Sequence, residues 1–207
     1  MIQSTNSSVL IKFKEKSDYE LVYRVDESIR DVLNSTILDI KKFAHSVVIS
    51  KSSVFPDIDQ YLSGSTDVVS KLQAFNLPVY ARIFRNEFVS QAWDFFSDAI
   101  VEINSYVMEA GIDGVITDFP GTAVKYRRNR CLGLGNKTPA YMSPVQAGSL
   151  LQLIPPQILP PAEAPNPILT ESDVVEPPLP SAVETGPTPD TGGGSTAVPP
   201  TATKWAA

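Results

Sequence analysis

Short apolar runs alternate with segments of helical periodicity along the body of the chain. Most of these runs are apolar at nearly every position, as expected of strands that are buried on both faces. They predict strands at residues 1–4, 21–25, 47–50, 79–84 and 112–117. Strands that alternate with helices in this way indicate a parallel sheet with helices packed outside it. A doubly wound sheet would give the same pattern as a barrel, so periodicity alone leaves both folds open.

The segments between the strands predict amphipathic helices, because their apolar residues recur at helical spacing. Asp26 is placed to cap the second helix, and Gly111 is placed to end the fourth in a left-handed conformation. Pro78 ends the third helix before the next strand. The positions expected to face the core are Val9, Leu10 and Phe13; Ile29, Val32, Leu33, Ile37, Ile40 and Phe43; Val68, Val69, Leu72 and Phe75; and Trp93, Phe96, Ile100, Ile103 and Val107.

Composition divides the chain into a body and a tail. Of the 18 prolines, 15 lie at or after Pro139, and residues 192–195 read Gly-Gly-Gly-Ser. We expect a domain over residues 1–132, a C-terminal extension over residues 133–154 and a disordered Pro-, Gly- and Thr-rich tail over residues 155–207. The net charge is −6, and most of it is in the tail. The body is close to neutral, which argues against nucleic-acid binding, since that requires a basic face.

Polar side chains follow the predicted strands, at the edge where ligands bind in parallel α/β folds. Lys51 is a candidate phosphate contact. Arg85 either binds a phosphate oxygen or forms an ion pair with Glu87 or another neighbour, and Asn86 lies beside it. Asp118 either helps to shape the site or stabilises the turn before Phe-Pro. The candidate substrate-binding residues are therefore Lys51, Arg85, Asn86 and Asp118.

No residue is assigned a catalytic or metal-binding role from the sequence. Neither of the Gly-rich phosphate-binding motifs, GxGxxG and GxxxxGK followed by Ser or Thr, is present. His45 is the only histidine, and its position after a helix predicts an ordinary helix-terminus role. The basic run at residues 125–130 is interpreted as a solvated helix end.

One segment has a more specific pattern. Residues 111–120 read Gly-Ile-Asp-Gly-Val-Ile-Thr-Asp-Phe-Pro, which resembles the motif Gly-x-Asp-Gly-x-x-Thr-Asp-x-Pro that closes the barrel of glycerophosphodiester phosphodiesterases. Residues 79–88 resemble the preceding strand of that family. Residues 1–4 resemble a mid-barrel strand that usually ends in Ser-Phe, although Thr5 stands here in place of the aromatic residue.

Further segments resemble the plant glycerophosphodiester phosphodiesterase-like proteins, which carry two tandem barrels and a C-terminal lipid anchor at the cell surface. These segments are residues 88–96, 102–106 and 126–132. The likeness extends from residue 1 to about residue 170. The resemblance implies that the chain is the C-terminal part of a TIM-type (β/α)8 barrel of the phospholipase C-like phosphodiesterase type.

The resemblance also implies a reaction, namely hydrolysis of glycerophosphodiesters to sn-glycerol 3-phosphate and an alcohol with a divalent metal, Ca²⁺ or Mg²⁺. In the family, carboxylates hold the metal and a His pair moves protons. Those groups lie on the first four strands, and none can be placed on this sequence. We therefore expect a fragment whose partner is the rest of the barrel, and which lacks the catalytic half. The alternative is a non-catalytic cell-surface protein that acts in cell-wall organisation.

The resemblance implies an extracellular or cell-wall location, reached through the secretory pathway. Asn6, Asn34 and Asn136 each begin a glycosylation sequon, which mildly supports that route. Cys131 is the single cysteine, so any disulfide partner lies outside this chain. The sequence contains no recognisable signal peptide, no transmembrane run and no hydrophobic tail after the small residues at 193–195 that would complete a lipid-anchor signal.

Overall fold

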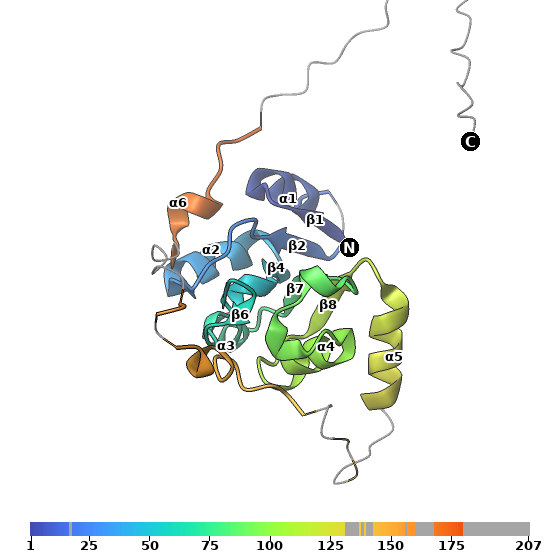
Figure 1. Ribbon diagram of the computed structural model, residues 1–207. Coiled ribbons are helices and arrows are strands. Elements are labelled where there is room, and N and C mark those ends of the chain that lie inside the picture. Colours follow the sequence, from blue (N-terminus) through green and yellow to red (C-terminus); the bar gives the residue numbers. More distant parts are fainter. Residues whose placement is uncertain are drawn as a thin grey trace, which may run out of the picture.

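Five parallel strands form the central sheet of the protein. The computed structural model describes residues 1–16, 18–130, 137, 139, 143–155, 157–159 and 168–179. The strands are hydrogen-bonded in chain order, β1-β2-β4-β7-β8, and every neighbouring pair is parallel (Figure 1). Their bounds are β1 Ile2–Ser4, β2 Leu21–Arg24, β4 Ser46–Ser50, β7 Val79–Phe84 and β8 Gly114–Thr117.

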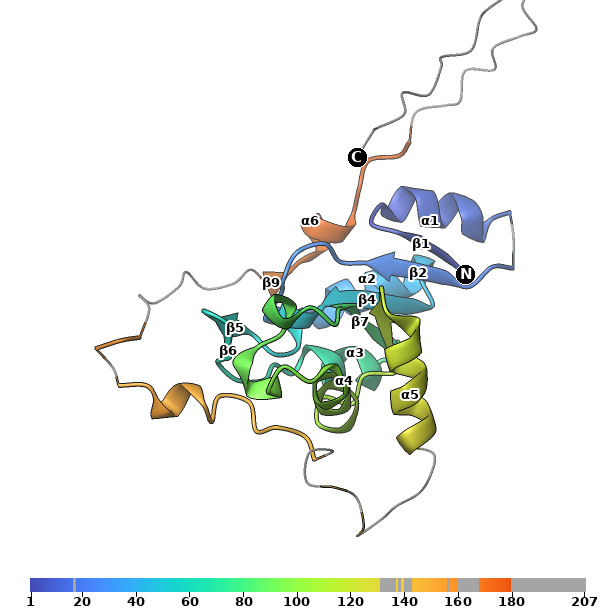
Figure 2. The ribbon, with the colours of Figure 1, turned by 45° about the vertical axis from the view of Figure 1, so that its right-hand side comes forward.

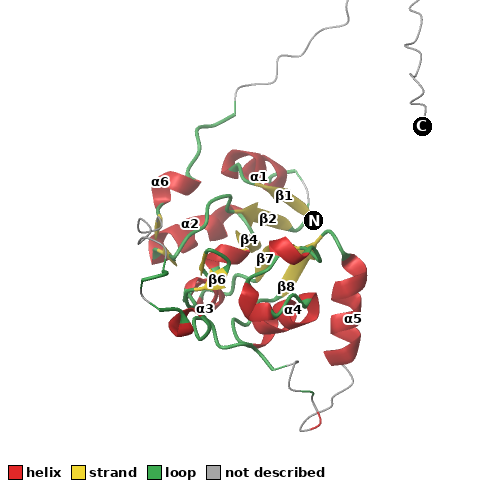
Figure 3. Ribbon diagram, viewed as in Figure 1, coloured by secondary structure: helices red, strands yellow, loops and turns green. Residues whose placement is uncertain are grey.

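The strand order distinguishes the two folds that periodicity left open. Each crossover moves one strand along in the same direction, and right-handed crossovers of that kind place all the connecting helices on the same face of the sheet. A doubly wound sheet would instead reverse its order partway along. The helices lie around the row of strands, as Figure 3 shows. They are α1 Ser7–Lys14, α2 Asn34–Phe43, α3 Val68–Ala74, α4 Ala99–Met108 and α5 Pro120–Arg130. This singly wound α/β arrangement fits a TIM-type barrel.

The core lies between the middle strands and the helices. Leu21 in β2 and Val47 and Ile49 in β4 are fully buried, as the apolar runs predicted. Tyr106 of α4 forms the aromatic centre of this core, with its ring 4.7 Å from Phe55 and 5.0 Å from Phe84. These contacts hold α4 against the carboxyl ends of β4 and β7, where the candidate site lies.

The second predicted helix begins later than the sequence pattern indicated. It was expected to follow Asp26, but α2 begins at Asn34. Residues 31 and 32 form instead the short strand β3 (Asp31–Val32), and the Ile29 amide donates to Ser53 Oγ at 2.9 Å. Ile29 and Val32 are buried as predicted, but both lie before α2 rather than in a helix.

The predicted apolar stripe before α4 is also corrected. Trp93 and Phe96 were expected in the core, yet their side chains are 39% and 73% exposed. Phe96 has a positive φ of 52°, which ends the short 3-10 turn η3 (Trp93–Phe95) and breaks the helical register. Asp98 then caps α4 through the amides of Ile100 and Val101. At Gly111, by contrast, φ is 73°, as predicted for a left-handed helix end.

Two loop structures rise beside the carboxyl ends of the strands. The first is an antiparallel hairpin of β5 (Asp57–Ile58) and β6 (Tyr61–Leu62), and the second contains η2 (Phe88–Ser90) and η3. The Trp93 amide donates to Gln60 O at 2.8 Å, and Asp94 Oδ2 accepts from the Leu62 amide at 3.0 Å. These bonds join the two loops into one wall of the candidate site.

A C-terminal segment returns to the first helices. Residues 168–179 lie within the stretch expected to be a disordered tail, yet they contain β9 (Ile168–Leu169) and α6 (Glu171–Val174). Strand β9 pairs in parallel with β3, and α6 lies beside α2 (Figures 1 and 2). Ser8 Oγ donates to the carbonyl of Pro177 at 3.0 Å. Leu169 and Val174 are part of the main core, so this segment belongs to the folded domain.

We expect Val174→Ala to destabilise the protein by about 2 kcal/mol, because it removes two buried methyl groups from a site that is 0% exposed. The melting temperature should fall by roughly 4–8 °C in a thermal melt. The neighbouring Val175 is 65% exposed, so Val175→Ala is the matched control and should leave the melting temperature nearly unchanged. Equal melting temperatures for the two variants would show that α6 does not contribute to the core.

Candidate functional site

A pocket opens at the carboxyl ends of β2, β4 and β7, and we call it the outer pocket. It has a volume of about 340 Å³. Three cations contribute to it, Lys51 after β4 and Arg82 and Arg85 in and after β7, against one acid, Asp26. Val25, Ser50, Ile83 and Ser90 complete its lining. Each of these cations has an acidic partner, but together with Arg24 the cations outnumber those acids, so the outer pocket keeps a net positive charge that suits an anionic group.

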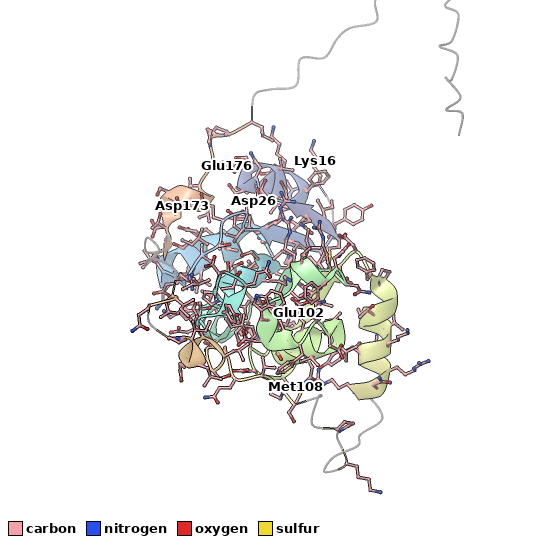
Figure 4. All side chains as sticks on the ribbon, in the orientation of Figure 1. Lys16, Asp26, Glu102, Met108, Asp173 and Glu176 are labelled. Atoms are coloured by element: carbon pink, nitrogen blue, oxygen red, sulfur yellow. The ribbon has the colours of Figure 1, made fainter. Side chains whose placement is uncertain are left out.

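Asp26 holds two arginines in place at the edge of the outer pocket. Its Oδ1 lies 2.9 Å from Nε of Arg24, the last residue of β2, and 3.6 Å from Nη1 of Arg82. Asp26 is labelled in Figure 4. Both guanidinium groups are partly shielded from solvent, so a shared carboxylate orients them without neutralising them both. Arg24 and Arg82 were not among the sequence candidates.

Arg85 and Asp118 meet across the neighbouring strands β7 and β8. Arg85 Nε donates to Asp118 Oδ2 at 3.1 Å, and both side chains are about half-exposed. The ion pair foreseen for Arg85 is therefore made with Asp118 rather than with Glu87. Asn86 turns away toward α5, where its Nδ2 donates to Thr122 Oγ1 at 2.9 Å. Of the four candidates, Lys51 and Arg85 share the outer pocket, Asp118 contacts Arg85, and Asn86 does not line the pocket.

Lys51 forms a largely buried ion pair below the outer pocket. Its Nζ lies 2.6 Å from Glu102 Oε1 of α4 and donates to the carbonyl of Ser90 at 2.9 Å. The side chain of Lys51 is 18% exposed and that of Glu102 is 1% exposed. Burial raises the pKa of the Glu102 carboxyl, and the Lys51 charge counteracts that shift. Glu102 is labelled in Figure 4, on α4.

A second cavity lies behind Lys51, and we call it the inner pocket. Its volume is about 160 Å³, and it extends between the β5–β6 hairpin, the η2–η3 loop and α4. Lys51 and Ser90 line both pockets. The other inner-pocket residues include apolar Phe55, Leu62 and Phe95 and polar Gln91, Asp57 and Glu102.

The described residues do not fit a divalent metal site of the kind that the resemblance implies. Among them, no three Asp, Glu, His or Cys side chains gather closely enough to hold a metal ion. Three of the acids at the site are also engaged with cations: Asp26 with Arg24, Glu102 with Lys51, and Asp118 with Arg85. These carboxylates are therefore arranged to orient positive side chains rather than to ligate a metal.

The other residues singled out in the sequence either have local structural roles or lie outside the described residues. His45 Nδ1 accepts from the Leu21 amide at 3.0 Å, so this histidine stabilises the start of β2. Asn6 caps α1 through its Oδ1, which accepts from the Val9 amide at 3.0 Å, and Asn34 is exposed at the start of α2. Asn136 and Cys131 lie outside the described residues.

A singly wound α/β sheet with a cationic pocket at the carboxyl ends of its strands is typical of TIM-type enzymes that act on anionic substrates. Comparison with family models agrees, because residues 1–122 match the glycerophosphoryl diester phosphodiesterase family. The chain belongs to that family.

Curated relatives from Arabidopsis thaliana cover almost the whole chain. Glycerophosphodiester phosphodiesterase GDPDL3 is 58% identical over 196 residues, which is 95% of this chain and 26% of the relative. Glycerophosphodiester phosphodiesterase GDPDL1 is 57% identical over the same shares of both chains. Protein SUPPRESSOR OF NPR1-1 CONSTITUTIVE 4 is 53% identical over 201 residues, 97% of this chain and 18% of the relative. The chain thus spans about a quarter or less of the length of these relatives.

No helix in the described part of the chain is both long and apolar enough to cross a membrane.

Proposed function

We propose that this chain is the phosphate-binding part of a glycerophosphodiester phosphodiesterase barrel. The protein that contains it would hydrolyse glycerophosphodiesters to sn-glycerol 3-phosphate and an alcohol. The observation that carries this proposal is the outer pocket, where Lys51, Arg82 and Arg85 face one cavity at the carboxyl ends of the strands. Guanidinium groups match the geometry of phosphate oxygens, and Asp26 holds Arg82 ready for such a contact.

We further propose that other strands complete the barrel beside β1 and β8, and that they supply the metal ligands and proton-transferring groups. The exposure of the strands supports this. The first three residues of β2 and the first four of β4 are buried, whereas no residue of β1 or β8 is fully buried. Edge strands with open hydrogen-bonding groups are completed by further pairing in a closed barrel. Ca²⁺ or Mg²⁺ would then be held by that other part.

The phosphate proposal is tested by titrating the chain with methyl phosphate in a calorimeter. Arg82→Ala should weaken binding about tenfold or more, because it removes a charge-assisted hydrogen bond worth roughly 1.5–3 kcal/mol. Arg128 is exposed on α5, away from the outer pocket, so Arg128→Ala is the control of equal charge and should bind as the wild type does. Equal affinity for both variants would refute the outer pocket as the phosphate site.

An assay of glycerophosphodiester hydrolysis is a second test of the proposed function. The chain by itself should not hydrolyse glycerophosphocholine, whereas a longer protein that includes the rest of the barrel should do so in a metal-dependent way. Hydrolysis by the 207-residue chain that EDTA abolishes would contradict the proposal that the metal ligands and proton-transferring groups lie on other strands of the barrel. Phosphate binding without hydrolysis in the longer protein would favour a non-catalytic cell-surface role in cell-wall organisation.

An extracellular or cell-wall location is part of this proposal. The exposed position of Asn34 at the start of α2 is compatible with glycosylation in the secretory pathway. Asn6 is a less open acceptor, because its side chain is engaged as the cap of α1.

A further inference from the structure

A further cavity lies between α4 and α5, over the start of β8, and we call it the α4–α5 groove. Its volume is about 630 Å³, compared with about 340 Å³ for the outer pocket. Figures 1 and 2 show the two helices side by side. The groove lies at the amino end of β8, whereas the outer pocket opens at the carboxyl ends of the strands. No described residue lines both cavities.

The lining of the α4–α5 groove is mostly apolar. Ile103 of α4 and Ile112 before β8 are buried parts of the core, and Val107 and Val115 are partly buried against it. Val124 of α5 is 63% exposed. The lining therefore extends from the core to the solvent. A concave site with apolar walls gains free energy when an apolar ligand covers them.

Two exposed arginines of α5, Arg127 and Arg130, also line the groove. Neither forms an ion pair with an acid among the described residues. Asp113 lines the groove too, but its Oδ2 accepts from the Val79 amide at 2.8 Å and from Gln73 Nε2 at 2.9 Å. The groove therefore combines an apolar lining with two guanidinium groups that have no acidic partner in the described part of the chain.

The rest of α5 adds to the positive charge beside the groove. The helix has 11 residues, of which four are cations and none is an acid, and Lys125 and Arg128 are exposed on it. Arg130 interacts with the hydroxyl of Tyr126, which donates to Asn104 Oδ1 at 3.1 Å. These contacts hold Arg130 beside the groove. A positive potential of this kind attracts anions.

Apolar walls and unpaired cations together select an amphiphilic anion. An inorganic anion would leave the apolar lining uncovered, an uncharged hydrocarbon would leave both arginines without a partner, and the arginines would repel a cationic amphiphile. A carboxylate matches the geometry of a guanidinium group. The volume of the groove also falls within the range of about 300–1,000 Å³ that is usual for small-molecule sites.

We propose that the α4–α5 groove binds a single-chain anionic amphiphile, of which a medium-chain fatty acid is the simplest example. Its carboxylate would pair with Arg127 and Arg130, and its hydrocarbon chain would cover Val107, Val115 and Val124. This inference does not rest on the proposed function, because the groove and the outer pocket lie toward opposite ends of the strands. The protein would thus have a second ligand site, remote from the phosphate site.

The first test titrates the 207-residue chain with decanoate in a calorimeter, at concentrations too low for micelles to form. Decanoate should bind about tenfold more tightly than octanoate, because two more methylene groups are buried. Decyltrimethylammonium has a chain of the same length and the opposite charge, and it should bind at least tenfold more weakly than decanoate. Equal affinity for octanoate and decanoate, or binding of the cation as tight as that of decanoate, would overturn the proposal.

Two adjacent arginines provide a matched pair of variants. Arg127→Ala should weaken decanoate binding about tenfold, because it removes a charge-assisted hydrogen bond to the carboxylate. Arg128 is exposed on the same helix and does not line the groove, so Arg128→Ala removes the same charge and should change the affinity less than about twofold. Equal losses would mean that the basic helix attracts anions without a defined site, and the proposal would then be wrong.

A groove-filling variant tests the apolar part of the site. Ala123 of α5 lines the groove, so Ala123→Leu occupies space that the hydrocarbon chain needs and should weaken decanoate binding about tenfold or more. Ala74 is exposed at the end of α3, so Ala74→Leu is the control and should bind decanoate as the wild type does. Thermal melts establish which variants are folded. Unchanged affinity in a folded Ala123→Leu variant would contradict the proposal, and the arginine pair decides if that variant does not fold.

Two further measurements distinguish other occupants of the groove. A longer protein that includes the rest of the barrel should bind decanoate as this chain does, and loss of binding there would show that the rest of the barrel covers the groove. In sedimentation without ligand, a dimer that Arg127→Ala dissociates would show that a second copy of the chain covers it. Either result would overturn the proposal. Decanoate binding without methyl phosphate binding would refute the proposed function alone, and the reverse would refute this inference alone.

Discussion

Replacing Lys51 with Met should destabilise the protein by about 3 kcal/mol at neutral pH, because it leaves Glu102 charged and unpaired in the core. Glu102 is 1% exposed, and Lys51 Nζ is the group that balances its charge. Urea unfolding followed by fluorescence measures this loss. The exposed pair Arg85–Asp118 provides the matched control, and Arg85→Met should change stability by less than about 1 kcal/mol.

The double variant Lys51→Met/Glu102→Leu separates lost charge balance from lost packing. Removing both charges leaves no unpaired ion, so this variant should lie within about 1 kcal/mol of wild type. If it is as unstable as Lys51→Met alone, the ion pair is not the cause of the loss.

The effect of Lys51→Met should also depend on pH. Burial raises the pKa of Glu102 and the Lys51 charge lowers it, so the variant has an even higher folded-state pKa. A raised pKa means that folded protein binds a proton more tightly than unfolded protein does. The difference in stability between variant and wild type should therefore be full above that pKa. It should shrink as the pH falls toward the ordinary value of about 4.3, and a difference that is constant with pH would contradict this account.

Tyr106→Ala should cost about 3–5 kcal/mol, because it empties the centre of the aromatic core beneath the site. The Tyr106 ring lies 4.7–6.0 Å from those of Phe55, Phe84 and Phe95, and it is 2% exposed. Tyr106→Phe keeps these contacts and loses only the 3.3 Å hydrogen bond to Lys51 O, so it should cost about 1 kcal/mol or less. Urea unfolding of both variants checks the ratio, and similar losses would show that the hydroxyl rather than the ring stabilises the core.

Local pattern was sufficient for the five strands of the central sheet, because strands buried on both faces must be apolar at nearly every position. Val79–Phe84 was found with its observed bounds for this reason. The start of α2 was not, because the pairing of Asp31–Val32 with Ile168–Leu169 depends on residues far along the chain. Phe96 has apolar spacing that fits a helix, but its left-handed backbone removes it from the core.

The candidate site was found only in part. Lys51 and Arg85 were identifiable as polar residues after strands, and both line the outer pocket. Arg82 was missed although it gave a signal, namely a charged residue inside an otherwise apolar strand. Glu102 gave no such signal, since its partner Lys51 is 51 residues away and one acid on an amphipathic helix is ordinary. Gln91 lies in a loop whose geometry depends on the β5–β6 hairpin, which the periodicity did not indicate.

The pairing of β3 with β9 has a consequence for synthesis on the ribosome. The hydroxyl of Thr36 donates to the carbonyl of Leu169, which follows it by 133 residues. At about 5–20 residues per second, Leu169 is translated roughly 7–27 seconds after Thr36. During that interval the apolar surface that later contacts Leu169 and Val174 stays exposed. Chaperones bind exposed apolar surface of this kind, so we expect them to bind the nascent chain until β9 and α6 have been synthesised.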